Sequence, residues 1–359
     1  MPLSSKVSRA STFILAVTIA VFAFACSGRG PGTEGGPIHL QGAGATFPNP
    51  LYQKWVSEYT KLHPNVKIDY QSIGSGGGIK QIQAQTVDFG ASDSPMKDED
   101  LKPAPGAILH VPTVLGAVVI TYNLQGIAKP LHFSPDVIAD IFLGKIKKWN
   151  DPRIKADNSD ANLPASDITV VHRSDGSGTS AVFTDYLSKV SPEWKEKVGS
   201  GTSPNWPVGI GGKGNEGVTG QVKQTPNTIG YVELAYAVQN KLPVALIKNR
   251  SGEWVEPGFD AVIAAAAESV ATTPEDLRVS ITDAAGKTAY PISSYTYILV
   301  YKEQKDAVKG KALVDFLWWG IHDGEKFARD LNYAPLPPEI VTRAEAKISS
   351  ITSGGKPLR

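Results

Sequence analysis

The 359-residue chain contains a single cysteine, Cys26, so no disulfide bond can form within it. An excess of one charge is also missing, because 36 lysines and arginines face 35 aspartates and glutamates and leave a net charge of +1. Proteins that bind nucleic acids through a general basic field carry a clear positive excess. We therefore expect no nucleic-acid partner.

Long hydrophobic runs are missing after the N-terminal segment. The run FILAVTIAVFAFA at 13–25 is shorter than the roughly 20 apolar residues that cross a membrane. It follows a short basic stretch that contains Lys6 and Arg9. This pattern is typical of a secretory signal peptide, which we predict over residues 1–25.

Cys26 directly follows this apolar run, at the position where bacterial lipoproteins receive their lipid. Phe24 is bulkier than the small residue usual two positions before such a cysteine, so a plain signal peptide cut near Cys26 stays the alternative. The glycine-rich stretch 26–37 has little to bury and is predicted to be a flexible tether. We expect a protein outside the cytoplasm, lipid-anchored to a membrane through Cys26.

Hydrophobic periodicity predicts short strands that alternate with amphipathic helices. The predicted strands are 66–73, 108–114, 117–123, 167–172 and 295–302, and the predicted helices are 51–63, 134–144, 179–187 and 307–321. Ser134 stands as the N-cap of its helix and Gly144 as its stop. The polar stretch 151–166 is predicted to be a surface loop. This alternation indicates an α/β fold with mostly parallel strand pairing, and the length favours two lobes.

Three segments rich in glycine and hydroxyl side chains each precede a predicted helix. They are GAGATFPNP (42–50), SIGSGGGIKQI (72–82) and HRSDGSGTS (172–180). A helix N-terminus presents free N–H groups and a partial positive charge, which suit an anion. A routine N-cap is the alternative for any one segment alone. Three of them in one chain, with Arg173 beside one, favour an oxyanion site.

Ser177, between two glycines, raises the alternative of a catalytic nucleophile. The segment does not match the G-x-S-x-G elbow, and His172 is too close along an extended strand to act as its base. The histidines lack metal-binding spacing, so we expect no metal and no cofactor. The stretch 209–217 has Gly214 after Lys213 where a phosphate-binding loop needs Ser or Thr, and is predicted to be a flexible loop. An enzyme is therefore not expected.

Asp93 is the carboxylate of most interest, with an N-cap for the acidic turn at 97–101 as the alternative role. A carboxylate 4 Å from an anion is repelled by about 4 kcal/mol at an effective dielectric of about 20. Hydrogen phosphate can relieve this by donating its proton to Asp93, whereas sulfate has no proton to give. Since about 1.4 kcal/mol is tenfold, Asp93 could separate the two anions by roughly a thousandfold.

Taken in order, the motifs resemble those of the phosphate-binding proteins of bacterial high-affinity phosphate ABC transporters, the Pst system. The resemblance covers nearly the whole mature chain, and its motifs are GAGATFP (42–48), IGSGGGIKQI (73–82), TVDFGASD (86–93), FLGKIKKWNDP (142–152), RSDGSGTS (173–180), GIGGKGNEGV (209–218), TIGYVELAYA (228–237) and ITSGGKPL (351–358). It implies a two-lobed, type II periplasmic binding protein with the ligand in the cleft between lobes. The implied division is 38–113 and 290–359 for lobe 1 and 114–289 for lobe 2.

The resemblance also implies which residues bind phosphate. These are Thr46, Phe47 through its N–H, Ser75, Asp93 as acceptor of the phosphate proton, Arg173, Asp175 as the partner that orients Arg173, and Ser177, Gly178 and Thr179 at a helix entrance. The implied function is a monomeric phosphate receptor that delivers phosphate to permease subunits with a cytoplasmic ATPase. A receptor for another tetrahedral oxyanion such as sulfate, a secreted phosphatase using Ser177, and an added adhesin or sensing role are the alternatives.

Overall fold

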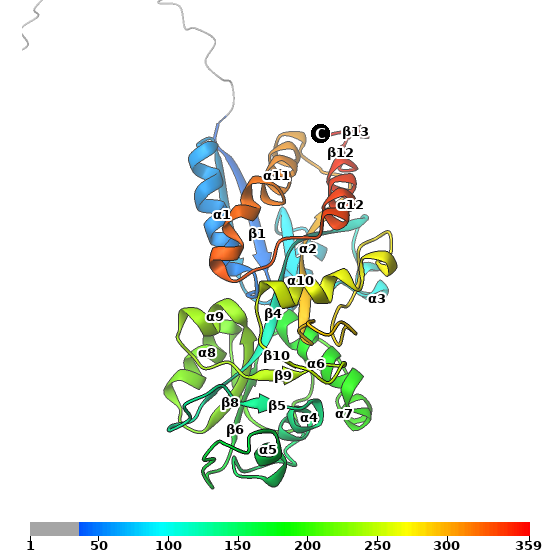
Figure 1. The fold of residues 1–359 in the computed structure, drawn as a ribbon. Coiled ribbons are helices and arrows are strands. Elements are labelled where there is room, and N and C mark those ends of the chain that lie inside the picture. The colour runs from blue at the N-terminus through cyan, green and yellow to red at the C-terminus, as the bar shows by residue number, and fades with distance from the viewer. Residues whose placement is uncertain (1–35) are drawn as a thin grey trace, which may run out of the picture. The chain divides into compact units, whose positions relative to one another are not determined.

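Figure 1 shows the computed structural model of the chain, which describes residues 36–359. Pro37–Arg359 form one compact unit. The predicted signal peptide (1–25), Cys26 and most of the predicted tether (26–37) lie outside the described residues, so they stay predictions. Within the described part of the chain, no helix has both the length and the apolar character needed to cross a membrane.

The strands build one large sheet and two small ones in the described residues. The large sheet has eight strands, in the order β2 (Val66–Ser72), β1 (Ile38–Gly44), β3 (Phe89–Ser92), β11 (Ser293–Tyr301), β4 (Ile108–Asn123), β8 (Thr228–Glu233), β6 (Thr169–Arg173) and β7 (Ile210–Gly212). The small sheets are β10 (Trp254–Val255), β9 (Leu246–Lys248) and β5 (His132–Phe133), and β12 (Thr352–Ser353) with β13 (Lys356–Pro357).

Helices of varied length connect these strands. They are α1 (Asn49–Leu62), α2 (Ser75–Gln83), α3 (Asp98–Leu101), α4 (Pro135–Phe142), α5 (Pro152–Asp157), α6 (Gly178–Val190), α7 (Pro192–Lys197), α8 (Gly214–Gln224), α9 (Leu234–Gln239), α10 (Phe259–Ala267), α11 (Ala307–Gly320) and α12 (Pro338–Ser349), with 3-10 turns η1 (Val270–Thr272), η2 (Asp323–Phe327) and η3 (Arg329–Leu331). Figure 1 shows α1, α11 and α12 together in one half and α4 to α9 in the other. The α/β class is confirmed.

Strand pairing is parallel at both ends of the large sheet and antiparallel in its middle. Strands β2, β1 and β3 pair in parallel, as do β8, β6 and β7, whereas β11 and β4 run antiparallel to their neighbours. The prediction of mostly parallel pairing therefore fits the two outer groups and misses the centre. The central strand β4 pairs with β11 up to Ala117 and with β8 from Val118 onward, so it links β11 to the group of β8, β6 and β7.

Strand β4 is continuous where the sequence predicts two strands separated near Gly116. A glycine weakens a strand pattern, but here it has a packing role. A Cβ at Gly116 would lie 2.6 Å from the Phe47 ring, so only glycine leaves room for that ring. The predicted lobe boundary at 113/114 falls within this strand. That boundary and the one at 289/290 stay predictions.

Local sequence signals place several helices as expected. Helix α1 buries one face that includes Trp55 and Tyr59, and Trp319 of α11 packs against both in edge-to-face contact. Ser134 occupies the N-cap position of α4, but its hydroxyl donates to Asp157 at 2.7 Å instead of capping the helix. Gly144 follows α4 with φ +74°, the left-handed conformation of a helix stop.

Two predicted loops are partly regular structure. The stretch 151–166 contains helix α5, because Asp151 accepts the N–H of Arg153 at 3.0 Å and caps a helix that the polar composition hides. The stretch 209–217, predicted to be a flexible loop, forms β7 and the first turn of α8. Pairing with β6 defines β7, and this long-range contact leaves no local signal.

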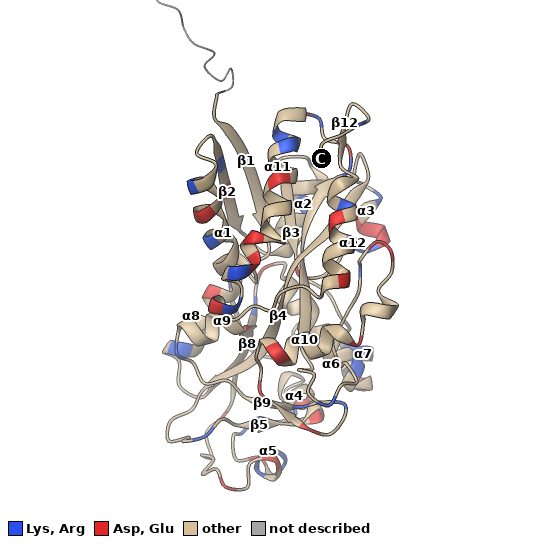
Figure 2. Cartoon of the chain, turned by 45° about the horizontal axis from the view of Figure 1, so that its top comes forward, with Lys and Arg blue, Asp and Glu red and all other residues tan. Residues whose placement is uncertain are grey.

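Charged side chains are spread over the helices. Figure 2 shows lysine and arginine interspersed with aspartate and glutamate along α1, α11 and α12. Pairs such as Lys54–Glu58 and Lys311–Asp315 join opposite charges one helical turn apart. This interspersion along the three helices agrees with the small net charge of the chain.

Candidate functional site: an anion-binding network

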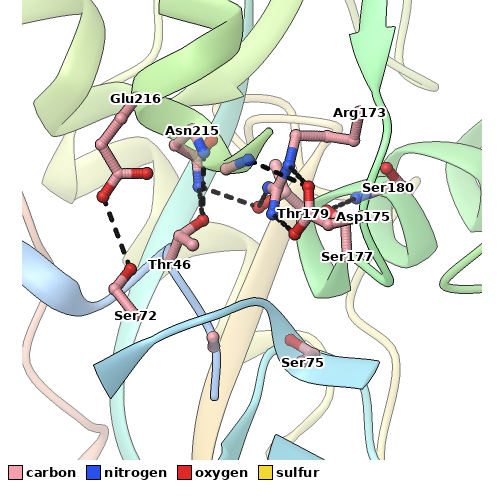
Figure 3. A network of polar contacts seen from close by, with 12 residues as sticks. Thr46, Ser72, Ser75, Arg173, Asp175, Ser177, Thr179, Ser180, Asn215 and Glu216 are labelled. Atoms are coloured by element: carbon pink, nitrogen blue, oxygen red, sulfur yellow. Dashed lines mark hydrogen bonds and ion pairs between the residues drawn. The ribbon is translucent and has the colours of Figure 1, made fainter. Parts of the chain in front are cut away.

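The structure brings the predicted anion-binding residues to one place, and Figure 3 labels Thr46, Ser75, Arg173, Asp175, Ser177 and Thr179 among them. Segments of the group of β2, β1 and β3 contribute Thr46 and Phe47 after β1, Ser75 at the start of α2 and Asp93 after β3. The segment from β6 to α6 contributes Arg173, Asp175, Ser177, Gly178 and Thr179. All of them except Asp175 are buried, and Asp175 is half-buried.

Arg173 and Asp175 form a two-pronged ion pair. The Nε of Arg173 donates to Oδ1 of Asp175 at 2.8 Å, and Nη2 donates to Oδ2 at 2.5 Å. The N–H of Gly214 adds a bond of 2.9 Å to Oδ1. Burial opposes the charged form of Asp175, but Arg173 and the Gly214 N–H outweigh burial and lower the pKa of Asp175. The carboxylate therefore stays ionised and fixes the guanidinium plane.

Asn215 joins the segment after β1 to the start of α6. Its side-chain Nδ2 donates to Oγ1 of Thr46 at 2.8 Å and to Oγ1 of Thr179 at 3.1 Å, as Figure 3 shows. Thr179 Oγ1 also accepts Nη1 of Arg173 at 3.2 Å, and the N–H of Glu233 donates to Oδ1 of Asn215 at 3.0 Å. Asn215 is fully buried. The amide thus holds the two threonine hydroxyls in one network with Arg173.

Two hydroxyl groups contact the carboxyl group of Asp93. Thr296 of β11 donates to Oδ1 at 2.9 Å and Ser75 donates to Oδ2 at 3.4 Å. Burial raises the pKa of Asp93 to about 7, although Thr296, the charge of Arg173 and Ser75 partly oppose the rise. Asp93 does not cap the acidic turn, because Lys97 is the N-cap of α3. The protonated and the ionised form of Asp93 are therefore both accessible near neutral pH.

Free backbone donors also point to an anion. Among the described residues, the N–H groups of Phe47, Ser75, Gly178 and Thr179 donate to no protein acceptor. All four residues are buried, and a buried N–H without a partner is costly. Ser75 and Gly178 are the first residues of α2 and α6, where the helix adds a partial positive charge. Oxygen atoms of an anion would satisfy these donors.

Ser177 caps helix α6 and is not placed as a nucleophile. Its Oγ accepts the N–H of Ser180 at 2.9 Å, which is the N-cap bond of α6. The ring of His172 stacks on Trp206, with centroids 5.0 Å apart, and its Nδ1 contacts the carbonyl of Arg173. His172 therefore engages neighbours other than Ser177.

Comparison with known proteins gives the family. Residues 30–319 match the model of the PBP superfamily domain. A phosphate-binding protein PstS from Xylella fastidiosa (strain 9a5c) is 48% identical over 86% of this chain and 84% of its own length. Another PstS, from Pasteurella multocida, is 48% identical over 89% of this chain and 93% of its own length. The chain belongs to the PstS family of phosphate-binding proteins.

A solved structure with a distant sequence shows the same fold. A phosphate binding protein from Stenotrophomonas maltophilia superposes with a TM-score of 0.67 at 20% identity, covering 88% of this chain and 96% of that chain. The predicted two-lobed periplasmic binding protein fold is confirmed. Both relatives are named phosphate-binding proteins, so the chain is a substrate-binding protein and not an enzyme.

The sequence analysis did not predict a role for several residues of this hydrogen-bond network. They are Asn215, Gly214, Thr296 and the tyrosines around the segment after β1. The motif at 209–218 carries the first two and is part of the resemblance, which is the one signal that could have found them. Thr296 lies within a buried strand, and nothing in that sequence pattern distinguishes it from an ordinary core residue.

Proposed function

We propose that the chain is a receptor that captures inorganic phosphate between its two lobes and delivers it to the permease of an ABC transporter. The observation that carries this proposal is the set of free N–H donors around one ion-paired arginine and one buried carboxyl group. Phosphate has several acceptor oxygens for the N–H donors and the arginine, and it has a proton that it can donate to the carboxyl group.

We assign the following residues to phosphate. The N–H groups of Phe47, Ser75, Gly178 and Thr179, the hydroxyls of Thr46, Ser75, Ser177 and Thr179, and the guanidinium of Arg173 donate to it, Asp93 accepts its proton, and Asp175 orients Arg173. Hydrogen bonds to a charged group contribute about 1.5–3 kcal/mol each, so several together offset the loss of hydration.

The charges of the network explain a preference for a protonated anion. Asp175 cancels the charge of Arg173, and Asp93 leaves the network at −1 when it is ionised. A fully deprotonated anion would meet repulsion from Asp93, whereas hydrogen phosphate turns that contact into a hydrogen bond. Sulfate is the second candidate ligand, and Asp93 disfavours it.

The receptor acts outside the cytoplasm, as a periplasmic binding protein. We further propose that it is a monomer held at a membrane by a lipid on Cys26, with residues 26–37 as tether. Such a tether would let the folded unit reach permease subunits that work with a cytoplasmic ATPase. Mass spectrometry of the membrane-bound protein tests this, since an N-terminus at an unmodified residue contradicts the anchor.

Calorimetric titration of the mature protein with phosphate and sulfate tests the function. We expect phosphate to bind at micromolar concentration or tighter, about −8 kcal/mol, and sulfate to give no heat. Equal binding of both anions contradicts phosphate selectivity. Hydrolysis of a phosphate ester that disappears in Ser177→Ala would favour the hydrolase instead.

A further inference from the structure

Three successive carbonyl groups in the loop at 45–47, which follows β1, each accept a bond from a tyrosine hydroxyl. Tyr70 donates to the carbonyl of Ala45, Tyr236 to that of Thr46 and Tyr333 to that of Phe47, with a donor–acceptor distance of 2.6 Å in each case. The tyrosines come from β2, from α9 and from the segment after η3. Parts of the chain that are far apart in sequence thus converge on one tripeptide.

The carbonyl contacts determine where each phenol proton goes. A phenol has one proton, and a carbonyl oxygen can only accept, so a short contact between the two commits that proton to the carbonyl. The hydroxyl of Tyr236 also lies 3.0 Å from Oε1 of Glu216, a longer contact than the 2.6 Å to Thr46. Burial raises the pKa of Tyr70, Tyr236 and Tyr333, which keeps all three phenols protonated.

Peptide geometry passes this constraint to the neighbouring N–H. The carbonyl of one residue and the N–H of the next lie in one rigid plane. The bond from Tyr236 to the Thr46 carbonyl therefore sets the direction of the Phe47 N–H, one of the free donors of the site. A hydrogen bond at the carbonyl also polarises the same peptide and strengthens its N–H as a donor by about 10–30%.

Tyr236 differs from Tyr70 in where it comes from. Tyr70 belongs to β2, which pairs with the same β1 that precedes the loop, so its bond stays within one strand group. Tyr236 belongs to α9, which packs on β8 and α8 in the group that carries Arg173. The bond from Tyr236 to Thr46 therefore depends on the approach of the two groups.

We propose that Tyr236 is a positioning residue for phosphate, which aims and polarises the Phe47 N–H through the Thr46 carbonyl when the lobes approach each other. This inference rests on the proposed function. It adds a residue that touches no anion, and it makes the strength of one ligand donor depend on contact between the lobes.

The variant Tyr236→Phe tests the inference, because it keeps the ring and removes the hydroxyl. We expect phosphate affinity to fall about five- to tenfold, the effect of one hydrogen bond. The ¹⁵N resonance of the Phe47 amide should move upfield, a change that a merely structural role would not produce. Tyr301→Phe is the matched control, since Tyr301 donates to the carbonyl of Ile82 at 2.8 Å outside the network. The control should change neither affinity nor the Phe47 resonance.

Each outcome separates this inference from the function on which it rests. If the parent protein does not bind phosphate, the proposed function fails. If the parent binds phosphate and Tyr236→Phe keeps both its affinity and the Phe47 resonance, only the role of Tyr236 is overturned. If Tyr236→Phe does not fold, the ¹³C carbonyl resonance of Thr46 in the parent decides, because a position typical of an unbonded carbonyl overturns the inference.

Discussion

Gly178 and Asp93 lie so close together that a Cβ on Gly178 would come within 2.5 Å of the Asp93 Oδ2 and 2.3 Å of the Ser75 Oγ. The first residue of α6 is thus fitted against the acidic side of the site. The position needs a glycine because of the space it leaves, and its backbone does not require a positive φ.

We predict that Gly178→Ala weakens phosphate binding about ten- to hundredfold. An extra carbon in filled space costs about 1–3 kcal/mol, and here it would push apart Ser75 and Asp93. Calorimetric titration measures the effect. Gly220→Ala in α8 is the control, because a Cβ there meets nothing within 4 Å. The control should bind normally and be slightly more stable, by about 0.4–1 kcal/mol. Unchanged binding by Gly178→Ala would remove Gly178 from the site.

We predict that Asp93→Asn reduces the preference for phosphate over sulfate at least tenfold. The amide has no charge to repel sulfate and can donate to it, whereas it loses the strong bond from the phosphate proton. Competition of sulfate against labelled phosphate measures the ratio. If sulfate remains excluded from the variant, Asp93 is not the group that selects.

The balanced proton of Asp93 predicts a pH dependence for sulfate. The pKa of Asp93 is raised to about 7, so lowering the pH through 7 protonates the carboxyl, removes its charge and gives it a donor. Sulfate affinity of the parent protein should therefore increase as the pH falls from 8 to 5. Asp93→Asn should show a flat profile over the same range. Titration at several pH values checks both, and a flat profile in the parent would contradict the mechanism.

Local chemistry explains which parts of this site are predictable from sequence. Ser177 and Gly178 stand at a helix entrance whose cap, glycine and hydroxyl pattern lies within a few residues of chain. The same holds for Ser75. Such local patterns predict hydrogen-bond donors whatever the position of the helix in the fold. The family resemblance then assigns the separate segments to one site. The anion network was therefore predictable as three separate pieces.

Long-range contacts explain what was missed. Tyr70, Tyr236 and Tyr333 each fit an ordinary buried pattern, and their common target appears only when three distant segments pack together. Gly116 interrupts a strand pattern in sequence, yet the reason for it is the Phe47 ring, 69 positions earlier in the chain. Sequence periodicity carries no information on such partners.

Glu233 supports a prediction on stability. It is fully buried at the end of β8, its Oε2 accepts the N–H of Ala235 at 2.8 Å, and its Oε1 has no partner. Burial raises the pKa of Glu233 well above its ordinary value and outweighs the opposing bond from the Ala235 N–H. The folded state then holds a proton that the unfolded state releases above its ordinary pKa of 4.5. The stability that Glu233 provides is thus present in acid and is lost as the pH rises from 4.5 toward the folded pKa.

We predict that Glu233→Gln flattens the fall in unfolding free energy between pH 5 and pH 8. Each proton bound by the folded state alone contributes about 1.4 kcal/mol per pH unit to that fall. Glu325, whose pKa burial raises to about 8, contributes in the same direction and remains in the variant. Denaturant unfolding at several pH values gives the comparison. Glu339→Gln, at an exposed position in α12, should keep the slope of the parent. An equal slope in Glu233→Gln would show that Glu233 is ionised in the fold.

We predict that Asn215→Asp weakens phosphate binding more than tenfold while leaving the fold in place. The change is nearly isosteric, but it replaces the amide that donates to Thr46 and Thr179 with a group that only accepts. It also adds a negative charge beside a network that already holds Asp93 and Asp175, and charges 4 Å apart repel by about 4 kcal/mol at an effective dielectric of about 20.

Titration and thermal unfolding of Asn215→Asp separate these two effects. Loss of the hydrogen bonds alone should lower the thermal stability and the phosphate affinity by amounts that do not depend on the salt concentration. Added repulsion should instead weaken phosphate binding most at low ionic strength, where charges are least screened. Asn65→Asp, at an exposed position before β2, provides the same change of net charge far from the network and should bind phosphate normally. Normal binding by Asn215→Asp would mean that the bridge between Thr46 and Thr179 has no part in holding the anion.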